Sequence, residues 1–336
     1  LPTDWNPSID EQLSQIDEAL IQSLKPARTD YTHIPFVTVD AASTTDIDDA
    51  LYAEENAQGL CLYVAIADPC ALIKEHSAIE KEALNRSNSV YFPAFQIPML
   101  PEKLAADVCS LVEGKERLAK VLKIQLNSDG SLIDYKLDNG VIKSRLKMSY
   151  LELSSFLTKA QTGDLDIEDG TKTSLALLEK IGDALLNDRK NNALVQPDRT
   201  EFYLELNEQQ KIAEIKPKDI SKAHRIIEES MVLANRCIAD LLKSSKLNSI
   251  FVRHAGVRGD RIEALNKVLN ENITEYQDSD IASLEGFIKT SRLTGQSDEL
   301  KDYQLLVSRQ LEKSTLNSEA GPHFGMGIAA YTNFTS

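Results

Sequence analysis

The sequence is short of positive charge for its size. It contains 37 Lys and Arg residues against 52 Asp and Glu residues, which gives a formal net charge of −15 over 336 residues. This balance argues against a protein that binds nucleic acid by global electrostatic attraction, although it leaves room for a local basic channel. Because 42 % of the residues are hydrophobic, the chain can bury a sizeable core, in one large domain or two ordinary ones.

Cysteine is also scarce, and no targeting segment is visible. The cysteines form no C-x-x-C pair and have no His at zinc-ligand spacing, so we expect a reduced, cytoplasmic environment. No run of about 18 apolar residues is present, which argues against a transmembrane helix and a membrane partner. The start at Leu1 has no basic region followed by an apolar stretch, so it is not typical of a signal peptide. The cysteines are Cys61, Cys70, Cys109 and Cys237.

The sequence does contain a dense acidic cluster. Asp40, Asp46, Asp48 and Asp49 lie within ten residues of one another. Carboxylates crowded this closely repel one another strongly when all are ionised. A hard divalent cation is the usual remedy, and Mg²⁺ in particular takes oxygen ligands while leaving room for substrate phosphates. The cluster therefore suggests metal-assisted phosphate chemistry.

The residues alone allow three interpretations of the cluster. A solvated acidic loop remains open. A Ca²⁺-binding EF-hand loop that starts at Asp46 would need Gly at its sixth position and Glu at its twelfth; Leu51 and Ala57 stand there, so this interpretation fails. In the third interpretation, Asp40 and the turn 46–49 converge on the ions of a Mg²⁺ site for phosphodiester hydrolysis.

Hydrophobic periodicity predicts a mixed α+β domain, with strands early in the chain and helices late. The acidic cluster falls at the end of one expected strand, where a rigid scaffold can aim catalytic groups. Helices are expected over 8–25, 76–86, 149–160, 172–190, 221–243, 261–270, 280–294 and 298–313. Strands or extended segments are expected over 36–39, 50–54, 60–67, 89–93, 96–101, 120–126 and 132–137, with a further hairpin over 201–215.

A set of motifs, in order along the chain, closely resembles the catalytic (RNB) domain of the ribonuclease II family. The resemblance spans roughly residues 30 to 336, after a helical lead-in over 1–29. Around Tyr150 and in 321–325 the chain resembles the bacterial exoribonuclease II branch more than the ribonuclease R branch. The motifs are Val39–Ala50, Val64–Pro69, Asn88–Tyr91, Ile97–Pro101, Cys109–Leu111, Ile227–Asn235, Gly321–Gly327 and Tyr331–Ser336.

This resemblance implies a fold, an activity and a metal site. The fold is a mixed sheet with packed helices. The activity is processive 3′→5′ hydrolysis of single-stranded RNA to nucleoside 5′-monophosphates, with Mg²⁺ (or alternatively Mn²⁺) and without a protein partner, by a monomer. The resemblance makes Asp40, Asp46, Asp48 and Asp49 the catalytic, metal-holding residues, and Asp48 the one most strictly needed for cleavage.

The resemblance also implies RNA-binding roles for Tyr91, Tyr150 and Glu228. Tyr91 matches an aromatic residue that stacks on a base near the 3′ end. Tyr150 and Glu228 match positions implicated in choosing RNA over DNA, for which a polar group that reaches the 2′-hydroxyl is the available discriminator. Without the resemblance, Tyr91 would be interpreted as a half-buried strand residue and Glu228 as a helix-surface carboxylate. His323 is interpreted as structural.

Two departures from the family pattern leave a second interpretation of the function open. Gln196 stands where the family has a second stacking aromatic, and Phe202 is a candidate substitute. The chain stops at Ser336, before the family's Pro-Ile-Arg-Arg/Lys-Tyr segment, and lacks cold-shock and S1 modules, so we expect a catalytic-core fragment with weak activity or none. This second interpretation is a non-catalytic, RNA-binding or regulatory relative with the same fold; a third option is a metal phosphodiesterase with another substrate.

Overall fold

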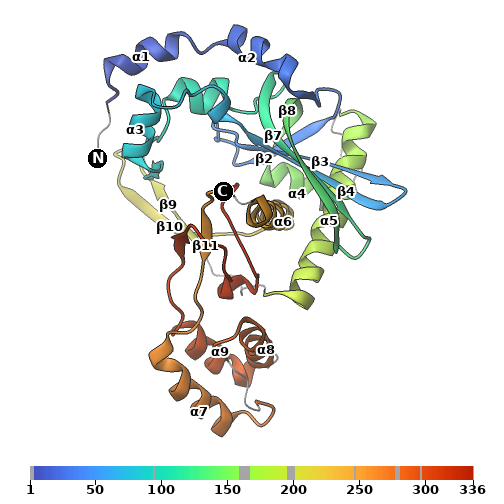
Figure 1. The fold of residues 1–336 in the computed structure, drawn as a ribbon, viewed down its shortest axis with the longest axis vertical. Helices are drawn as coiled ribbons and strands as arrows, with labels where there is room; N and C mark the ends of the chain where they lie inside the picture. The colour runs from blue at the N-terminus through green and yellow to red at the C-terminus, as the bar shows by residue number, and fades with distance from the viewer. Residues whose placement is uncertain are drawn as a thin grey trace. The chain divides into compact units, whose positions relative to one another are not determined.

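The computed structural model describes residues 4–93, 95–158, 167–194, 201–245, 247–276, 281–295 and 297–335. The chain forms two compact units. Unit 1 comprises Leu1–Gly182 and Arg199–Glu228, and unit 2 comprises Asp183–Asp198 and Glu229–Ser336. Figure 1 shows both units. The predicted mixed α+β fold is confirmed, because helices pack beside a sheet that contains both parallel and antiparallel pairs.

The main sheet of unit 1 closes on itself. Its strand order is β1-β8-β2-β3-β4-β7, and β7 pairs in addition with β8. The long strand β8 makes this possible, because its first part pairs with β7 and its last residues continue in parallel alongside β2. The strands are β1 (Thr29–Asp30), β2 (Phe36–Asp40), β3 (Asp49–Asn56), β4 (Gly59–Ala67), β7 (Glu116–Leu126) and β8 (Leu132–Ser149).

The interior of this sheet explains why the early part of the sequence is so apolar. Seven of the nine residues of β4 are buried. Phe36, Tyr63, Val121 and Ile142 from four different strands share one core cluster. A continuously apolar strand is expected where both faces are covered, so β4 lies at the centre and fixes its neighbours β3 and β7.

A bulge falls among three basic residues, Lys143, Arg145 and Lys147, which occupy alternate positions near the end of β8. The β2 register shifts so that Phe36 faces Ser144 while Val37 faces Leu146, which leaves Arg145 as the extra residue. Arg145 Nη2 donates to the Thr32 carbonyl at 2.8 Å, and Lys147 Nζ donates to the Thr44 carbonyl at 2.6 Å. These residues brace nearby loops, and they do not form one evenly spaced row.

The predicted single helix over 8–25 is wrong, because the chain forms two helices there. These are α1 (Pro7–Ser14) and α2 (Glu18–Leu24), visible in blue in Figure 1. The side chain of Asp17 caps the second helix by accepting a hydrogen bond from the Leu20 amide at 3.0 Å. A capping Asp in extended conformation ends one helical run and starts another. The apolar period continues across the break, which is why periodicity alone missed it.

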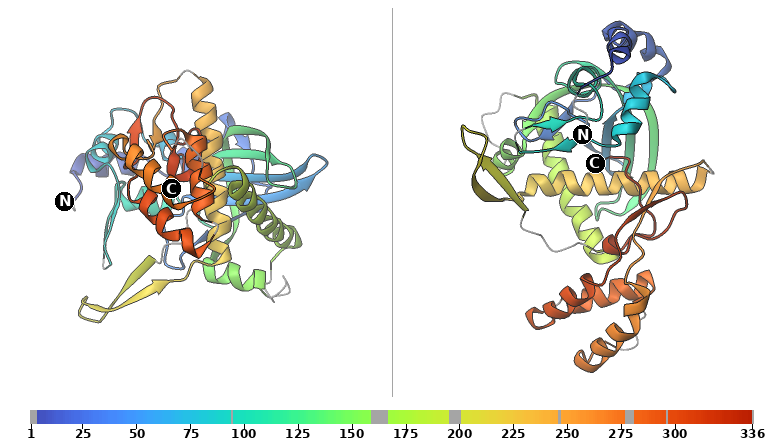
Figure 2. Two further views of the ribbon diagram at one scale, coloured as in Figure 1. Left: turned by 90° about the horizontal axis from the view of Figure 1, so that it is seen from below. Right: turned by 90° about the vertical axis from the view of Figure 1, so that its left-hand side faces the viewer.

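The remaining elements of unit 1 agree with the predicted segments. A small hairpin, β5 (Val90–Tyr91) and β6 (Gln96–Ile97), occupies the predicted extended region. The predicted hairpin over 201–215 is β9 (Glu201–Leu206) and β10 (Ile212–Lys218), which Figure 2 shows as an arm separate from the main sheet. The helices are α3 (Ala78–Arg86), α4 (Tyr150–Thr158), α5 (Asp169–Asn192) and α6 (Lys222–Ser245), the last two extending into unit 2.

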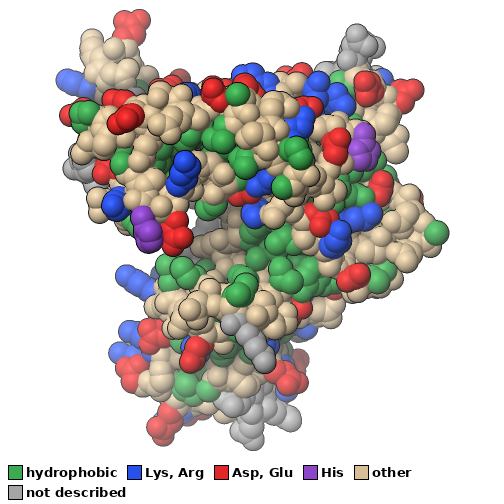
Figure 3. Space-filling view, turned by 45° about the horizontal axis from the view of Figure 1, so that its top comes forward, with side chains coloured by type: hydrophobic (Ala, Val, Ile, Leu, Met, Phe, Trp, Pro, Cys, Tyr) green, Lys and Arg blue, Asp and Glu red, His purple; other side chains and the backbone are tan. Residues whose placement is uncertain are grey.

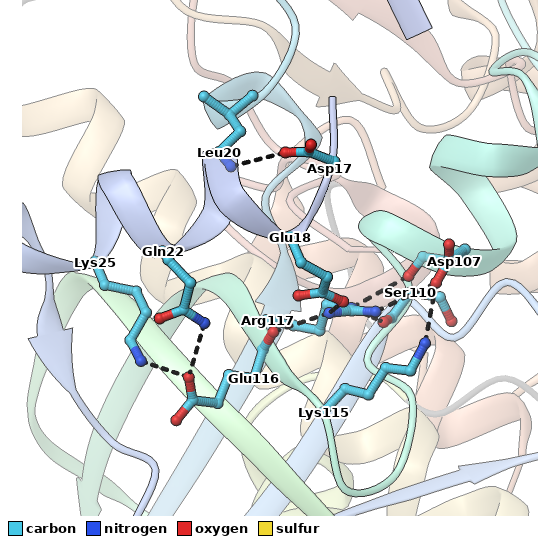
Figure 4. A network of polar contacts seen from close by, with 10 residues as sticks. All are labelled: Asp17, Glu18, Leu20, Gln22, Lys25, Asp107, Ser110, Lys115, Glu116 and Arg117. Atoms are coloured by element: carbon cyan, nitrogen blue, oxygen red, sulfur yellow. Dashed lines mark hydrogen bonds and ion pairs between the residues drawn. The ribbon is translucent and has the colours of Figure 1, made fainter. Parts of the chain in front are cut away.

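One buried arginine links several elements of unit 1. The Arg117 side chain on β7 is fully buried. Its Nη1 donates to Glu18 Oε1 at 2.8 Å, and its Nε lies 3.2 Å from the carbonyls of Asp107 and Ser110. Figure 4 shows this network. A buried charge is tolerated only when it is paired and hydrogen-bonded. Arg117 meets this requirement by bonding to Glu18 of α2 and to the segment 107–110, and so it links the two.

Unit 2 is built around a small helical core. Leu269, Phe287, Val307 and Phe324 share one buried cluster. The helices are α7 (Ile262–Asn272), α8 (Leu284–Thr294) and α9 (Lys301–Ser308), and β11 (Phe251–Arg253) pairs with β12 (Thr315–Asn317). Among the described residues of both units, the short helical turns are η1 (Lys25–Ala27), η2 (Pro69–Ala71), η3 (Lys103–Val108), η4 (Gly259–Arg261), η5 (Asp298–Leu300) and η6 (Phe324–Met326).

Asn235 on α6 fastens the end of unit 2. Its Oδ1 accepts from the amides of Phe334 and Thr335 at 2.8 and 2.9 Å, and its Nδ2 donates to the Tyr331 hydroxyl at 2.9 Å. We expect Asn235→Ala to lower the free energy of unfolding by about 2–3 kcal/mol, because it leaves buried amides unpaired. Urea denaturation measures this. Asn272→Ala, which removes one exposed side-chain bond, is the control, and an equal loss in both variants would contradict the expectation.

The described helices include none that is long and apolar enough to cross a membrane. All four cysteines are free thiols, and three of them, Cys61, Cys109 and Cys237, are buried. On the face shown in Figure 3, acidic and basic side chains are interspersed.

Candidate functional site

The four aspartates lie where two strands of the main sheet meet. Asp40 is the last residue of β2, Asp49 is the first residue of β3, and Asp46 and Asp48 lie in the connection between them. The sequence predicted this placement, at a strand end and in the turn that follows. Because β2 and β3 are adjacent antiparallel strands, all four side chains are held at one end of the sheet.

The loop that carries Asp46 and Asp48 is anchored by a buried serine. The Ser110 hydroxyl accepts a hydrogen bond from the Ile47 amide at 3.0 Å and donates to the Thr45 carbonyl at 2.8 Å. The Ile47 side chain is buried beneath the loop. The Asp48 carbonyl in turn accepts from the Ala67 amide at 2.8 Å. Backbone contacts thus fix the positions from which the carboxylates project.

Crowding and burial make these carboxylates hard to ionise together. Burial, followed by the charges of Asp40 and Asp48, raises the pKa of Asp49 to about 7. Burial, followed by Asp46 and Asp40, raises the pKa of Asp48 to about 6. The pKa of Asp40 is also raised, mainly by burial, although Lys147 partly offsets this. The cluster stores electrostatic repulsion that a bound cation would relieve.

The oxygen atoms of the cluster fit a hard cation. The Oδ2 atoms of Asp40 and Asp49 are buried and have no hydrogen-bond partner among the described residues. Across the described ranges, no three acidic, His or Cys side chains form a ready-made metal cage. The unpartnered oxygens of Asp40 and Asp49 are the hard ligands that Mg²⁺ prefers, and Mg²⁺ also keeps water and substrate phosphate in its shell.

The raised pKa of Asp49 gives a testable pH dependence. A carboxyl whose pKa is higher in the folded chain stabilises the fold at low pH, and this contribution is lost as pH rises from about 4 to about 7. In EDTA, we expect the unfolding free energy of the unsubstituted protein relative to Asp49→Asn to fall by about 2 kcal/mol between about pH 5 and about pH 7.5. Urea denaturation at both pH values tests this, and a difference that is independent of pH would contradict it.

Exposed aromatic side chains lie beside the cluster. Tyr91 on β5 is 66 % exposed, and its hydroxyl donates to Asp46 Oδ2 at 3.3 Å. Next to it, Phe92 and Phe95 are exposed and stack on each other with ring centroids 4.7 Å apart. The interpretation of Tyr91 as a half-buried strand residue does not hold, because a large aromatic face is open to solvent next to the acidic group.

The sheet register brings Tyr150 to the same place. Asp40 pairs in parallel with Ser149, the last residue of β8, and Tyr150 follows as the first residue of α4. Burial, and then the charges of Asp40 and Asp49, raise the pKa of Tyr150 to about 12. The phenol is therefore neutral at physiological pH and lies within the electrostatic reach of the cluster.

Glu228 lies on the first two turns of α6, within unit 1. It is exposed, and its Oε2 accepts from Arg225 Nη1 at 2.9 Å. His224, one turn earlier, packs its ring flat against Tyr150. Sequence reasoning missed His224; its signal was the four-residue spacing from Glu228, which places both on one helix face.

His323 is not alone in the structure. It stacks on His254 with ring centroids 5.2 Å apart, and burial lowers the pKa of both rings. The pair joins the segments that flank the helical core of unit 2 through a backbone bridge, and the structural role of His323 stays a prediction. Gln196 lies outside the described residues, and Phe202 on β9 is 61 % exposed.

Comparison with known proteins gives consistent matches. A model of the RNB domain matches residues 28–336. Exoribonuclease 2 of Edwardsiella piscicida is 36 % identical over 314 residues, covering 92 % of this chain and 48 % of the relative. Exoribonuclease 2 of Actinobacillus pleuropneumoniae serotype 5b is 34 % identical over 325 residues, with 92 % and 49 % coverage. The chain spans about half the length of the curated relatives it matches.

Solved structures share the fold. The apo form of Mycoplasma genitalium RNase R matches with a TM-score of 0.89 and 25 % identity, covering 100 % of this chain and 52 % of the other. Yeast Ssd1, described as a pseudonuclease, matches with a TM-score of 0.69 and 18 % identity, covering 94 % and 38 %. The second likeness concerns the fold alone, and it shows that the fold by itself does not decide between catalysis and its loss.

Proposed function

The chain belongs to the ribonuclease II family, which is defined by the RNB domain, and on that premise we propose that its protein is a 3′→5′ exoribonuclease. We propose that it hydrolyses single-stranded RNA processively to nucleoside 5′-monophosphates and requires Mg²⁺, with Mn²⁺ as an alternative. The observation that carries the proposal is the complete set of four aspartates at the β2–β3 junction, with buried carboxylate oxygens that lack protein partners.

The residues of the site have separable tasks in this proposal. Asp40, Asp46, Asp48 and Asp49 would hold the metal. When bound, Mg²⁺ supplies charge neutralisation of the phosphate, activation of water and stabilisation of the leaving oxygen. The anchoring of the loop by Ser110 fixes the carboxylates before substrate arrives, so little reorganisation is needed during the reaction.

Tyr91 supplies a sequence-independent contact with a base. Its exposed ring lies beside Asp46, so a base stacked there would set the distance from the RNA end to the carboxylates. We expect Tyr91→Ala to weaken binding of single-stranded RNA by about five- to 100-fold, because stacking contributes about 1–3 kcal/mol per base. Fluorescence anisotropy measures this. Tyr91→Phe keeps the ring and is the control; equal losses in both variants would argue against stacking.

We also propose that the protein acts as a monomer in the cytoplasm. A separate proposal is that Tyr150 and Glu228 favour RNA over DNA. The neutral Tyr150 hydroxyl near Asp40 and Asp49 can both donate and accept a hydrogen bond. A ribose 2′-hydroxyl can do the same. The four free cysteines are compatible with a reducing compartment.

The experiment that tests the function compares end-labelled RNAs. The full-length protein, with Mg²⁺ and single-stranded RNA labelled at the 3′ end, should release labelled mononucleotide from the start of the reaction. RNA labelled at the 5′ end should pass from full length to a short limit product with few intermediate lengths, because a processive enzyme stays on one RNA until only a short end remains. Internal fragments would indicate an endonuclease. RNA that is bound but remains intact would support the non-catalytic alternative, which is kept open because a pseudonuclease shares this fold.

A further inference from the structure

The ring of Tyr150 is supported by a second ring. His224 from the first turn of α6 stacks on Tyr150 from the first turn of α4, with centroids 3.9 Å apart and planes inclined by 9°. In this stack the imidazole ring packs nearly parallel against one face of the phenol. The plane of the Tyr150 ring, and with it the direction of the hydroxyl, is therefore set by the position of His224.

His224 is itself held by hydrogen bonds. The Ser221 amide donates to His224 Nδ1 at 3.2 Å, and the Ser221 hydroxyl lies 2.9 Å from the same atom. The Ser154 hydroxyl of α4 donates to the Ser221 hydroxyl at 2.9 Å. Because a backbone amide can only donate, Nδ1 is an acceptor and a neutral imidazole carries its proton on Nε2. This series of hydrogen bonds, from Ser154 through Ser221 to His224, joins α4 and α6 beside the stacked rings.

The packing around this turn of α6 is tight. A Cβ atom added to Gly182 of α5 would lie 2.8 Å from the Ile226 side chain, closer than real contacts allow. Glycine at 182 therefore lets α5 and α6 approach closely just beyond His224. Glu228 follows His224 by four residues, so the two share one face of the helix.

We propose that His224 is a positioning residue that orients the Tyr150 hydroxyl toward the ribose of the bound nucleotide and so determines the preference for RNA over DNA. This inference rests on the proposed function. A 2′-hydroxyl is recognised by a single hydrogen bond, and a donor or acceptor free to swing away from it discriminates less. The His224 ring, stacked on the phenol of Tyr150, restricts that motion without contacting the substrate.

Binding measurements on an inactive background test the proposal. The protein with Asp48→Asn is titrated with matched single-stranded RNA and DNA, and the ratio of the two affinities is measured by fluorescence anisotropy. Adding His224→Ala should lower the RNA:DNA affinity ratio about three- to tenfold, as expected from losing one aromatic contact. Adding His224→Phe, which keeps a flat ring, should leave the ratio within about twofold. Ser221→Ala should give an intermediate loss.

The outcomes separate this inference from its alternatives. If His224 served only the fold, His224→Ala would weaken RNA and DNA binding equally and leave the ratio unchanged, which overturns the proposal. A parent protein without any RNA preference overturns it as well. Failure of the proposed function has a different signature, since the protein with Asp48 intact would then leave RNA unhydrolysed whatever the binding ratio.

Discussion

Replacing Asp48 with Asn should lower the rate of RNA hydrolysis by about 10³-fold or more, because metal-assisted charge stabilisation contributes several kcal/mol to such reactions. The pKa of Asp48 is raised mainly by burial, and then by the negative charges of Asp46 and Asp40. The Asn side chain has nearly the same shape, so the loop anchored by Ser110 should keep its course. The loss should therefore fall on turnover, with RNA affinity largely kept.

Single-turnover hydrolysis of labelled RNA, measured beside RNA affinity, checks this expectation. The matched control is Asp134→Asn, which removes an exposed carboxylate near the start of β8 and should leave the rate unchanged. The acidic cluster lies at the opposite end of this strand, where Ser149 pairs with Asp40. Equal rates in the Asp48 variant and the unsubstituted protein would remove the acidic cluster from the mechanism. A rate loss that follows a loss of affinity would show that Asp48 serves binding instead.

Replacing Arg117 with Ala should lower the free energy of unfolding by about 2–4 kcal/mol, because it leaves two backbone carbonyls without their hydrogen-bond donor and opens a cavity where the buried side chain packs. The guanidinium satisfies the carbonyls of Asp107 and Ser110 and pairs with Glu18 (Figure 4). Without it these carbonyls are buried and unpaired. Since the hydroxyl of the same Ser110 anchors the loop at Ile47, the substitution should also reduce the rate of RNA hydrolysis.

Urea denaturation measures the stability loss. The control is Lys136→Ala, which removes an exposed lysine that pairs with Asp138 and should change the unfolding free energy by less than about 1 kcal/mol. An Arg117→Ala protein as stable as the control would contradict the structural role assigned to the network. Unchanged hydrolysis in a strongly destabilised variant would separate the network from the site.

The sequence was sufficient where the signal was local. Alternation and apolar runs located β2, β4 and the hairpin β9–β10, and the chain order of the aspartates placed them at the end of β2. The break between α1 and α2 was missed because the apolar period continues through it, and only the cap at Asp17 marks it.

The non-local features could not be predicted in the same way. Closure of the main sheet depends on β8 pairing with both β7 and β2, and nothing within β8 specifies two partners. The Arg117 network joins residues almost 100 positions apart. The contact between Tyr150 and His224 likewise joins two helices separated in sequence by the hairpin β9–β10 and α5. Each depends on packing that only the folded chain creates.

The most direct test of the central claim, that the β2–β3 acidic cluster holds a divalent cation, is calorimetric titration of the metal-free protein with Mg²⁺. The account predicts saturable binding near neutral pH, with release of protons from carboxyls whose pKa is raised. It also predicts that this binding is lost in Asp48→Asn and kept in Asp134→Asn. Identical Mg²⁺ binding by the unsubstituted protein and Asp48→Asn, or no saturable binding by either, would contradict the account.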